Sequence, residues 1–80
     1  MVEQPLQNRI VTSRDVMHGK PRIAGTRITV VQVLDLLAAG KSVVDVISED
    51  YYPDLTEADV YACIAYASQM IRADRIVPTA

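Results

Sequence analysis

The sequence predicts a small, mainly α-helical domain, in which three helices form a helix-turn-helix bundle behind a small N-terminal β-hairpin. Three observations predict this fold class. The chain has 80 residues and half of them are apolar, so we expect one small domain with a real core. Three helix-start signals follow one another along the chain, and short β-branched runs precede them. The aromatic residues are four Tyr without Phe or Trp, which predicts an aliphatic core.

The hairpin is predicted over about 10–28. Residues 10–12 are a short β-branched run, while residues 21–23 and 26–28 flank a turn signal. At that turn Gly25 can supply a positive φ, which other residues adopt only under strain. We therefore expect a two-stranded hairpin, with the first run as a possible third strand. A lone hairpin is marginal in water, so it has to pack against helices.

Each helix begins at a hydroxyl residue that can accept a hydrogen bond from a free backbone amide: Thr29, Ser42 and Thr56. The first two also fit a capping box, with Gln or Asp three residues later. Gly40 ends the first helix, and Pro53 prevents continuation of the second. The predicted helices span about 30–39, 43–49 and 57–72.

The two ends of the chain show no hydrophobic period. We expect residues 1–8 to form a flexible N-terminal arm, residues 9–72 a single domain and residues 73–80 a C-terminal tail. The single cysteine, Cys63, cannot form an intrachain disulfide, and there is neither a signal peptide nor an apolar run long enough to cross a membrane. A cytoplasmic protein that does not contact membranes is expected.

Catalysis, metal binding and cofactor binding are not expected. Ser13, Asp15 and His18 lie within six residues of one another, whereas the groups of a catalytic triad are rarely so close in sequence. One His and one Cys cannot form a zinc site, which needs four ligands. The three glycines are too dispersed for a phosphate loop. We therefore expect a binding protein that is not an enzyme.

Charge is divided unevenly along the chain, although the net charge is only −2. Residues 1–30 hold five Lys+Arg against two Asp+Glu, a balance of +3, while residues 31–80 hold three against eight, a balance of −5. Arginine suits contact with phosphate or guanine, and a β-ribbon can enter a groove. The alternative is that these cations are solvated or pair with acids of the helical half. The candidates for contact with nucleic acid or a partner are Arg14, Lys20, Arg22 and Arg27.

The third helix does not have the composition of a DNA-reading helix. Across residues 57–71 only Glu57, Asp59, Ser68 and Gln69 lie outside the apolar set. One apolar face is enough to pack a helix against two short neighbours, so the surplus predicts a partner helix, most simply that of a second copy. The alternative is that these side chains belong to the core. The candidate dimer or partner face comprises Val60, Tyr61, Ile64, Ala67 and Ile71.

Three segments carry a resemblance to a known family. They are the stretch from Asp15 to Ile28 with its Gly-Lys-Pro-Arg-Ile-Ala-Gly-Thr-Arg-Ile core, the helix break Leu-Leu-Ala-Ala-Gly-Lys-Ser, and Asp-Tyr-Tyr-Pro-Asp-Leu-Thr at 50–56. Over about residues 9–68 the chain resembles the bacterial and archaeal family catalogued as domain of unknown function 433. The doubled Tyr51-Tyr52 departs from the single Tyr of the family pattern and affects only the length of that loop.

The resemblance implies a homeodomain-like or winged-helix-like fold with three helices and a small β element. It also implies an antitoxin of the VapB type, encoded beside a toxin with a PIN-like ribonuclease fold, and it implies no catalytic residues. Our hypothesis is a dimeric, DNA-binding autorepressor that binds operator DNA and neutralises its toxin through the helical half or through residues 72–80. The alternative is a protein–protein interaction module that does not bind DNA.

Overall fold

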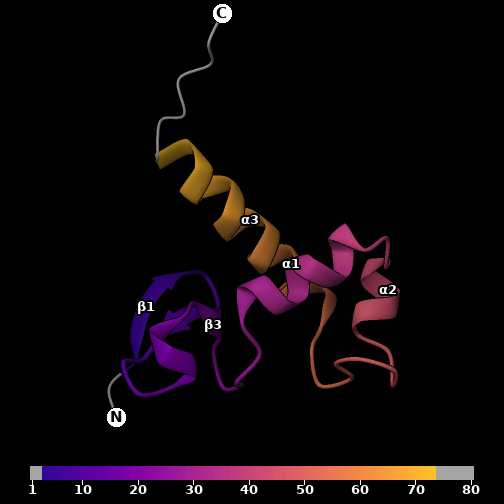
Figure 1. The fold of residues 1–80 in the computed structure, drawn as a ribbon, viewed down its shortest axis with the longest axis horizontal. Coiled ribbons are helices and arrows are strands. Elements are labelled where there is room, and N and C mark those ends of the chain that lie inside the picture. Colours follow the sequence, from indigo (N-terminus) through magenta and orange to yellow (C-terminus); the bar gives the residue numbers. More distant parts are fainter. Residues whose placement is uncertain (1–2, 74–80) are drawn as a thin grey trace, which may run out of the picture.

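A computed structural model describes residues 3–73 and shows a small antiparallel sheet beside three helices (Figure 1). The sheet and α1 and α2 lie side by side, and α3 rises away from them. The predicted C-terminal tail, 73–80, lies outside the described residues except for Ala73. The elements are β1 (Gln4–Gln7), β2 (Ile10–Thr12), a one-turn segment η1 (Met17–Gly19), β3 (Arg22–Ile23), α1 (Val30–Ala38), α2 (Val43–Val46) and α3 (Glu57–Ala73).

The predicted fold class, a three-helix helix-turn-helix bundle with a two-stranded hairpin, is wrong. The sheet has three antiparallel strands in the order β1-β2-β3. In addition, α2 is a single turn of four residues and not a full helix. The molecule is therefore a three-stranded antiparallel sheet packed with three helices, of which α2 is a single turn.

Strand β1 forms from residues that the sequence assigns to a flexible arm. Gln4 pairs with Thr12 and Pro5 with Val11 across the antiparallel ladder, with an irregularity between Pro5 and Gln7. The first three residues of β1 are exposed, so no alternation of apolar and polar side chains marks the strand in the sequence. A proline is tolerated there because β1 lies at the edge of the sheet.

The predicted hairpin around Gly25 forms only in part. Gly25 has a φ of 81°, as a turn glycine is expected to have, and the Ile23 amide donates to the Ile28 carbonyl at 3.0 Å. Beyond this turn, however, the second arm contributes only an isolated bridge between Arg22 and Thr29. Strand β3 instead pairs with β2, which places Ile23 opposite Ile10.

All three helix-start signals are present as hydrogen-bonded caps. At α1 the Gln32 amide donates to Thr29 Oγ1 at 3.2 Å, and the Thr29 amide donates to Gln32 Oε1 at 2.8 Å. At α2 Ser42 and Asp45 exchange the same pair of bonds, at 3.1 and 3.0 Å. The hydrogen bond from Ser42 lowers the pKa of the exposed Asp45 carboxyl below its usual range. Reciprocal bonds between Thr56 and Asp59 begin α3.

Helix α2 ends at Val46, whereas the sequence predicts an end near residue 49. The hydroxyl of Ser48 donates to the Asp45 carbonyl at 2.6 Å, and the Tyr52 amide donates to the Val46 carbonyl at 2.9 Å. These carbonyls would otherwise accept the next bonds of the helix. A side chain and a returning loop therefore stop α2 after one turn.

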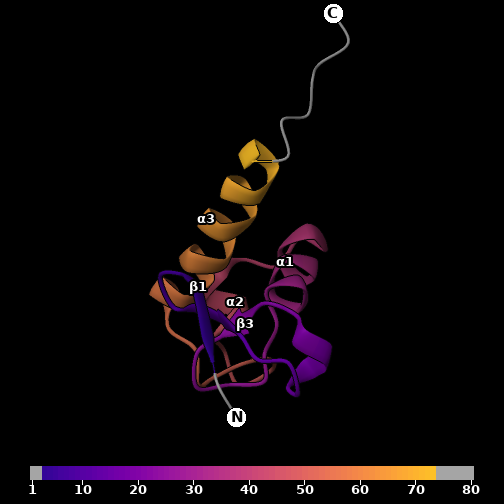
Figure 2. The ribbon, with the colours of Figure 1, turned by 90° about the vertical axis from the view of Figure 1, so that its left-hand side faces the viewer.

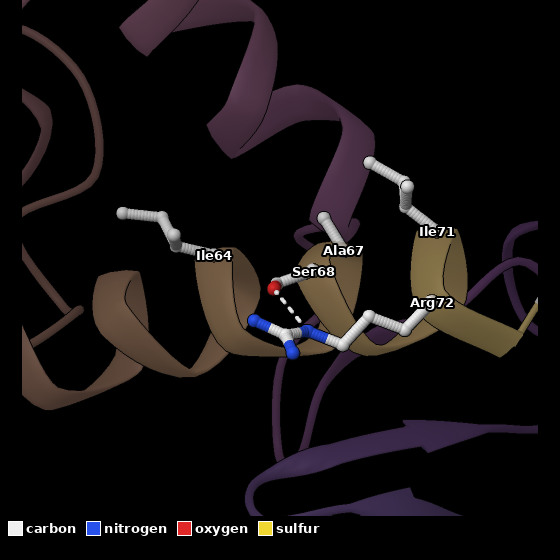
Figure 3. A pocket seen from close by; sticks show the side chains of 5 residues that line it. All are labelled: Ile64, Ala67, Ser68, Ile71 and Arg72. Carbon is white, nitrogen blue, oxygen red and sulfur yellow. Dashed lines mark hydrogen bonds between the residues drawn. The ribbon is translucent and has the colours of Figure 1, made fainter. Parts of the chain in front are cut away.

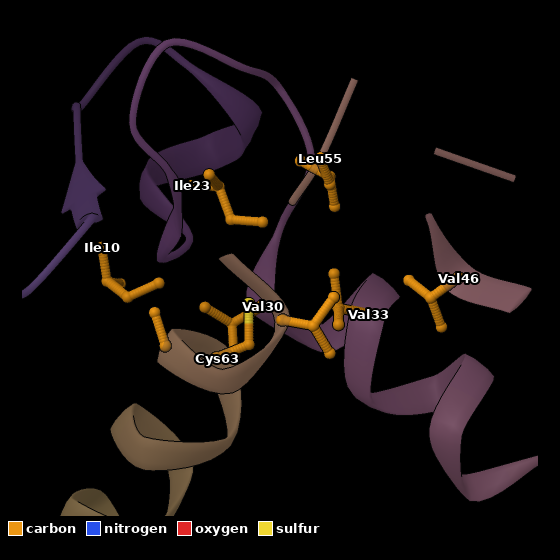
Figure 4. Close-up of a cluster of buried hydrophobic side chains, with 9 residues drawn as sticks. Ile10, Ile23, Val30, Val33, Val46, Leu55 and Cys63 are labelled. Atoms are coloured by element: carbon orange, nitrogen blue, oxygen red, sulfur yellow. The ribbon is translucent and has the colours of Figure 1, made fainter. Parts of the chain in front are cut away.

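The core is aliphatic, as expected, and lies where the sheet meets the helices (Figure 4). Strand residues Ile10 and Ile23 contact it from one side, and Val46 is the only fully buried residue of α2. An ion pair between Arg9 and Asp59, 3.1 Å long, ties the β1–β2 turn to the first turn of α3. The core cluster comprises Ile10, Ile23, Val30, Val33, Val46, Leu55, Val60, Ala62 and Cys63.

The first half of α3 is packed into the body of the molecule, and the partly buried Tyr66 extends this contact with the core by one further turn. Its buried residues, Asp59, Val60, Ala62 and Cys63, lie in the first two turns, where α3 contacts α1, α2 and β2. From Ile64 to Ala73 no residue is buried, and both views show this end of α3 standing clear of the other elements (Figures 1 and 2). Among residues 3–73, no helix is long and apolar enough to cross a membrane.

Candidate functional site

Arg22 is buried, contrary to its predicted role in contacting nucleic acid or a partner. Only 4% of the residue is exposed. Its guanidinium donates to Ser13 Oγ at 2.8 Å, to the Thr26 carbonyl at 3.1 Å and to Glu3 Oε2 at 3.1 Å. Because these bonds join the start of β1, the loop after β2 and the turn after β3, Arg22 is a structural residue of the sheet.

The other predicted arginines lie together on the surface. Arg14 and Arg27, thirteen residues apart in the sequence, line one hollow of about 460 Å³ together with Asp15, Met17 and His18. Both arginines are exposed, and within residues 3–73 neither forms an ion pair with a carboxylate. We call this set the basic hollow; it combines two guanidinium groups, an imidazole and one carboxylate.

Lys20 is exposed but does not line the basic hollow. It follows η1 directly, and its amide donates to the Met17 carbonyl at 3.1 Å. Its ammonium group therefore adds positive charge close to the turn that carries His18. Three of the four predicted contact residues, Arg14, Lys20 and Arg27, remain available at the surface.

The backbone beside the basic hollow adopts an uncommon conformation. Met17, His18 and Gly19 have successive φ values of 49°, 58° and 77°, in the left-handed region. Non-glycine residues rarely occupy this region, and each costs about 1 kcal/mol or more. The Gly19 amide donates to the Val16 carbonyl at 3.0 Å and Thr12 Oγ1 donates to the Gly19 carbonyl, so the surrounding structure fixes the turn.

Strained turns of this kind cluster at functional sites, where they position a side chain that regular structure would direct elsewhere. Here the turn places His18 in the lining of the basic hollow. This turn is not predicted from the sequence. Its only local signal is Gly19, because neither methionine nor histidine indicates a left-handed turn by itself.

The three groups of the hypothetical triad are not assembled. Ser13 is fully buried and its hydroxyl accepts from Arg22, whereas His18 is exposed in the basic hollow. Cys63 is also fully buried, and burial together with the charge of Asp59 raises the pKa of its thiol to about 11. That thiol is protonated at neutral pH. In residues 3–73 no group of three His, Cys, Asp or Glu side chains is placed to hold a metal ion.

The predicted dimer or partner face on α3 divides into two parts. Val60 is fully buried in the core, so its assignment to that face is wrong. Tyr61, Ile64 and Ile71 are 55%, 41% and 58% exposed, and Ala67 is partly exposed. Val60 fits the helical spacing of the face. It lies, however, in the half of α3 that packs against α1 and β2, where this side of the helix is buried in the core.

A second hollow, shallow and widely open, lies along the exposed part of this face. It is lined by Ile64, Ala67, Ser68, Ile71 and Arg72, all from α3 (Figure 3). The side chain of Arg72 folds back along the helix, and its Nε donates to Ser68 Oγ at 3.4 Å. The hollow is therefore apolar along one side and has a cationic edge.

Comparison with known proteins gives one match. Neither the curated proteins nor the solved structures contain a match to this chain. A family described as "Protein of unknown function (DUF433)" matches residues 10–67, from β2 to the middle of α3. The matched segment includes all the basic-hollow residues and is well over half of the chain. The chain therefore belongs to this family, whose function is unknown.

Proposed function

We propose that the chain is the dimeric antitoxin of a toxin–antitoxin pair, which acts in the cytoplasm, binds its own operator DNA as an autorepressor and neutralises a PIN-like ribonuclease. The antitoxin class rests on the motif resemblance at residues 15–28 and 50–56. The observation that supports DNA binding is the basic hollow, where Arg14 and Arg27 lie together without ion-pair partners among residues 3–73.

The distribution of cations supports the use of this surface. Arg9, although exposed, pairs with Asp59, and the buried Arg22 pairs with Glu3, which leaves Arg14, Lys20 and Arg27 as the exposed cations of the N-terminal half without an ion pair among residues 3–73. Guanidinium groups bind phosphate oxygens with two parallel hydrogen bonds and stay charged at all physiological pH values. The single carboxylate in the hollow, Asp15, reduces but does not cancel this charge.

Toxin binding is supported by the opposite sign of charge on the helical half. A ribonuclease has to attract RNA, so its substrate groove is basic and an acidic surface complements it. Six acidic residues from α1 to the start of α3 are exposed: Asp35, Asp45, Glu49, Asp50, Asp54 and Glu57. In the proposed account, the basic and the acidic halves of the chain therefore bind different partners.

The DNA-binding proposal is tested by titrating the promoter DNA upstream of the gene at several salt concentrations. If each copy of a dimer uses its three exposed cations, about six phosphates are neutralised and the slope of log K against log salt is about −5. The double variant Arg14→Ala/Arg27→Ala retains about two such contacts, so we expect a slope near −2 and weaker binding.

Lys41→Ala provides the matched control. It removes one exposed cation between α1 and α2, where Lys41 lies 5.8 Å from the ring centroid of Tyr51, far along the chain from the basic hollow. Its slope should equal that of the wild type. An equal slope in the double variant would exclude the basic hollow as the DNA-binding surface.

The alternative function, an interaction module without DNA binding, is favoured by the apolar face of α3. Co-expression with the product of the adjacent reading frame separates the two functions. A stable complex that does not retard promoter DNA even at low salt would contradict the autorepressor function and support the interaction module.

A further inference from the structure

The exposed half of α3 has the arrangement of a helix that lacks its neighbour. Its last ten residues, 64–73, contain no buried side chain, yet Ile64 and Ile71 are apolar and 41% and 58% exposed. A helical segment of this length is marginal in water without tertiary contacts. A partner surface would stabilise it.

The hollow on α3 has the geometry that receives a side chain from another helix. Ile64, Ala67, Ser68 and Ile71 stand at positions i, i+3, i+4 and i+7 and line the hollow from one face (Figure 3). Four residues at this spacing form the hole into which a facing helix inserts one knob. The small Ala67 and Ser68 at the centre leave room for that knob.

The same face carries a seam with heptad spacing. Tyr61, Ile64, Ser68 and Ile71 are separated by three, four and three residues, which is the a/d pattern of two helices that pack along their length. All four are exposed. The seam runs from the packed half of α3 into its projecting half, so a partner helix can lie along both.

We propose that the second copy of the chain occupies this face, and that the two α3 helices pair antiparallel with Ile64 of each copy inserted into the hollow of the other. In this register Ile64 of one copy faces Ser68 of the other, and Tyr61 faces Ile71. Every large seam residue therefore has a partner, and the small Ser68 leaves room for the large Ile64. Such a seam is self-complementary, as a two-fold dimer requires. A parallel pair would instead oppose Ser68 to Ser68 and bring the two Arg72 side chains together.

The exposed area is sufficient for a reversible dimer. The exposed fractions of Tyr61, Ile64 and Ile71 together equal about one and a half complete side chains, or ~300 Å² of apolar surface per copy at ~200 Å² for a large side chain. With about 65% of a homodimer interface apolar, both copies together bury ~900 Å². Interfaces of this size are at the weak end of specific association, so we expect a dissociation constant in the micromolar range.

This inference rests on the dimeric state in the proposed function but not on DNA binding. Its test is the molecular mass of the chain in solution, measured by sedimentation equilibrium from ~1 to ~300 μM across the expected micromolar range. We expect a monomer–dimer equilibrium for the wild type and a monomer at all concentrations for Ile71→Glu. A monomeric wild type at ~300 μM would overturn the proposal.

Gln69→Glu is the matched control, because it adds the same charge to the same projecting half of α3 but away from the seam. It should dimerise like the wild type. If Ile71→Glu also dimerises like the wild type, the seam is not the interface. Because Ile71 is exposed and outside the core, far-ultraviolet circular dichroism should show the same fold in both variants.

Cysteine pairing determines the direction of the helices. An antiparallel pair joins Ile64→Cys in one copy to Ser68→Cys in the other when the two variants are mixed and oxidised. Ser68→Cys alone should not cross-link, because in the antiparallel register the two Ser68 positions are offset by four residues, or ~6 Å along the helix axis. Self-cross-linking of Ser68→Cys would show parallel helices and refute the register. Native Cys63 is fully buried and does not compete.

Dimer loss and loss of DNA binding are separate results. If Arg14→Ala/Arg27→Ala dimerises but leaves the salt slope unchanged, the DNA-binding proposal fails and the dimer stands. If Ile71→Glu abolishes the dimer, the interface is located whether or not DNA binds.

Discussion

Replacing Arg22 by alanine tests whether this arginine belongs to the fold or to a binding surface. The guanidinium makes two short bonds to buried or backbone acceptors, Ser13 Oγ and the Thr26 carbonyl, and each contributes about 1.5 kcal/mol because the donor is charged. The pair with Glu3, whose side chain is 48% exposed, adds less than about 1 kcal/mol. The Nε of Arg22 is buried without a hydrogen-bond partner, which costs about 1 kcal/mol and reduces the net stabilisation by that amount.

We therefore expect Arg22→Ala to lower the free energy of unfolding by about 2–3 kcal/mol. An 80-residue domain has only about 4–12 kcal/mol in total, so this loss is large. Urea denaturation followed by circular dichroism should show a midpoint about 2 M lower, for a denaturant dependence near 1–1.5 kcal/mol/M.

The exposed Arg27 provides the control for this measurement. Arg27→Ala removes the same kind of side chain from the surface and should change the free energy of unfolding by less than about 0.5 kcal/mol. If Arg22→Ala unfolds at the wild-type midpoint, as Arg27→Ala should, the structural assignment of Arg22 is refuted; loss of DNA binding in that normally stable variant would make Arg22 a contact residue.

Three further predictions concern the core, the thiol and the capping carboxylate. Val60→Ala should cost about 2 kcal/mol in urea denaturation because Val60 is fully buried, whereas Ile71→Ala, at the projecting end of α3, should leave the monomer's stability unchanged; equal losses would contradict the division of that face. The raised pKa of Cys63, about 11, predicts that at pH 8 a thiol reagent reacts far more slowly with native than with urea-unfolded protein. Equal rates would show an accessible thiol. Because the folded state lowers the pKa of Asp45, its contribution to stability is present above the unfolded value near 3.8 and is lost as the pH falls through the folded value. The difference in melting temperature between pH 7 and pH 3 should therefore be smaller in Asp45→Asn, and an unchanged difference would contradict this role.

Features with local causes could be predicted from the sequence. The caps at Thr29, Ser42 and Thr56 depend on residues only three positions apart. The local sequence is therefore enough to predict them, whatever the rest of the fold. The turn at Gly25 likewise needs only a residue that tolerates positive φ.

Features with non-local causes could not be predicted. Strand β1 has exposed side chains and contains Pro5, so its pairing with β2 leaves no hydrophobic alternation to read. The early end of α2 depends on a loop amide, that of Tyr52, returning to the Val46 carbonyl. Local patterns therefore gave the helix starts, but neither the sheet nor the length of the second helix.

The candidate site shows the same division. Charge counting selected four cations but could not separate the buried Arg22 from the exposed Arg14 and Arg27, because burial depends on Ser13 and Thr26 being brought to it by the fold. The convergence of Arg14 and Arg27 on one hollow is also a product of the fold. Apolar periodicity likewise placed Val60 on the exposed face, although Val60 is fully buried in the core.

Binding of nucleic acid by the basic hollow is tested most directly by a nuclear magnetic resonance titration of the isotope-labelled chain with its promoter duplex. We expect the largest amide shift changes at Arg14, His18 and Arg27, around the hollow that these residues line. Residues at the projecting end of α3 should remain unchanged. Shift changes confined to α2 or α3, or none at low salt, would contradict binding at this hollow.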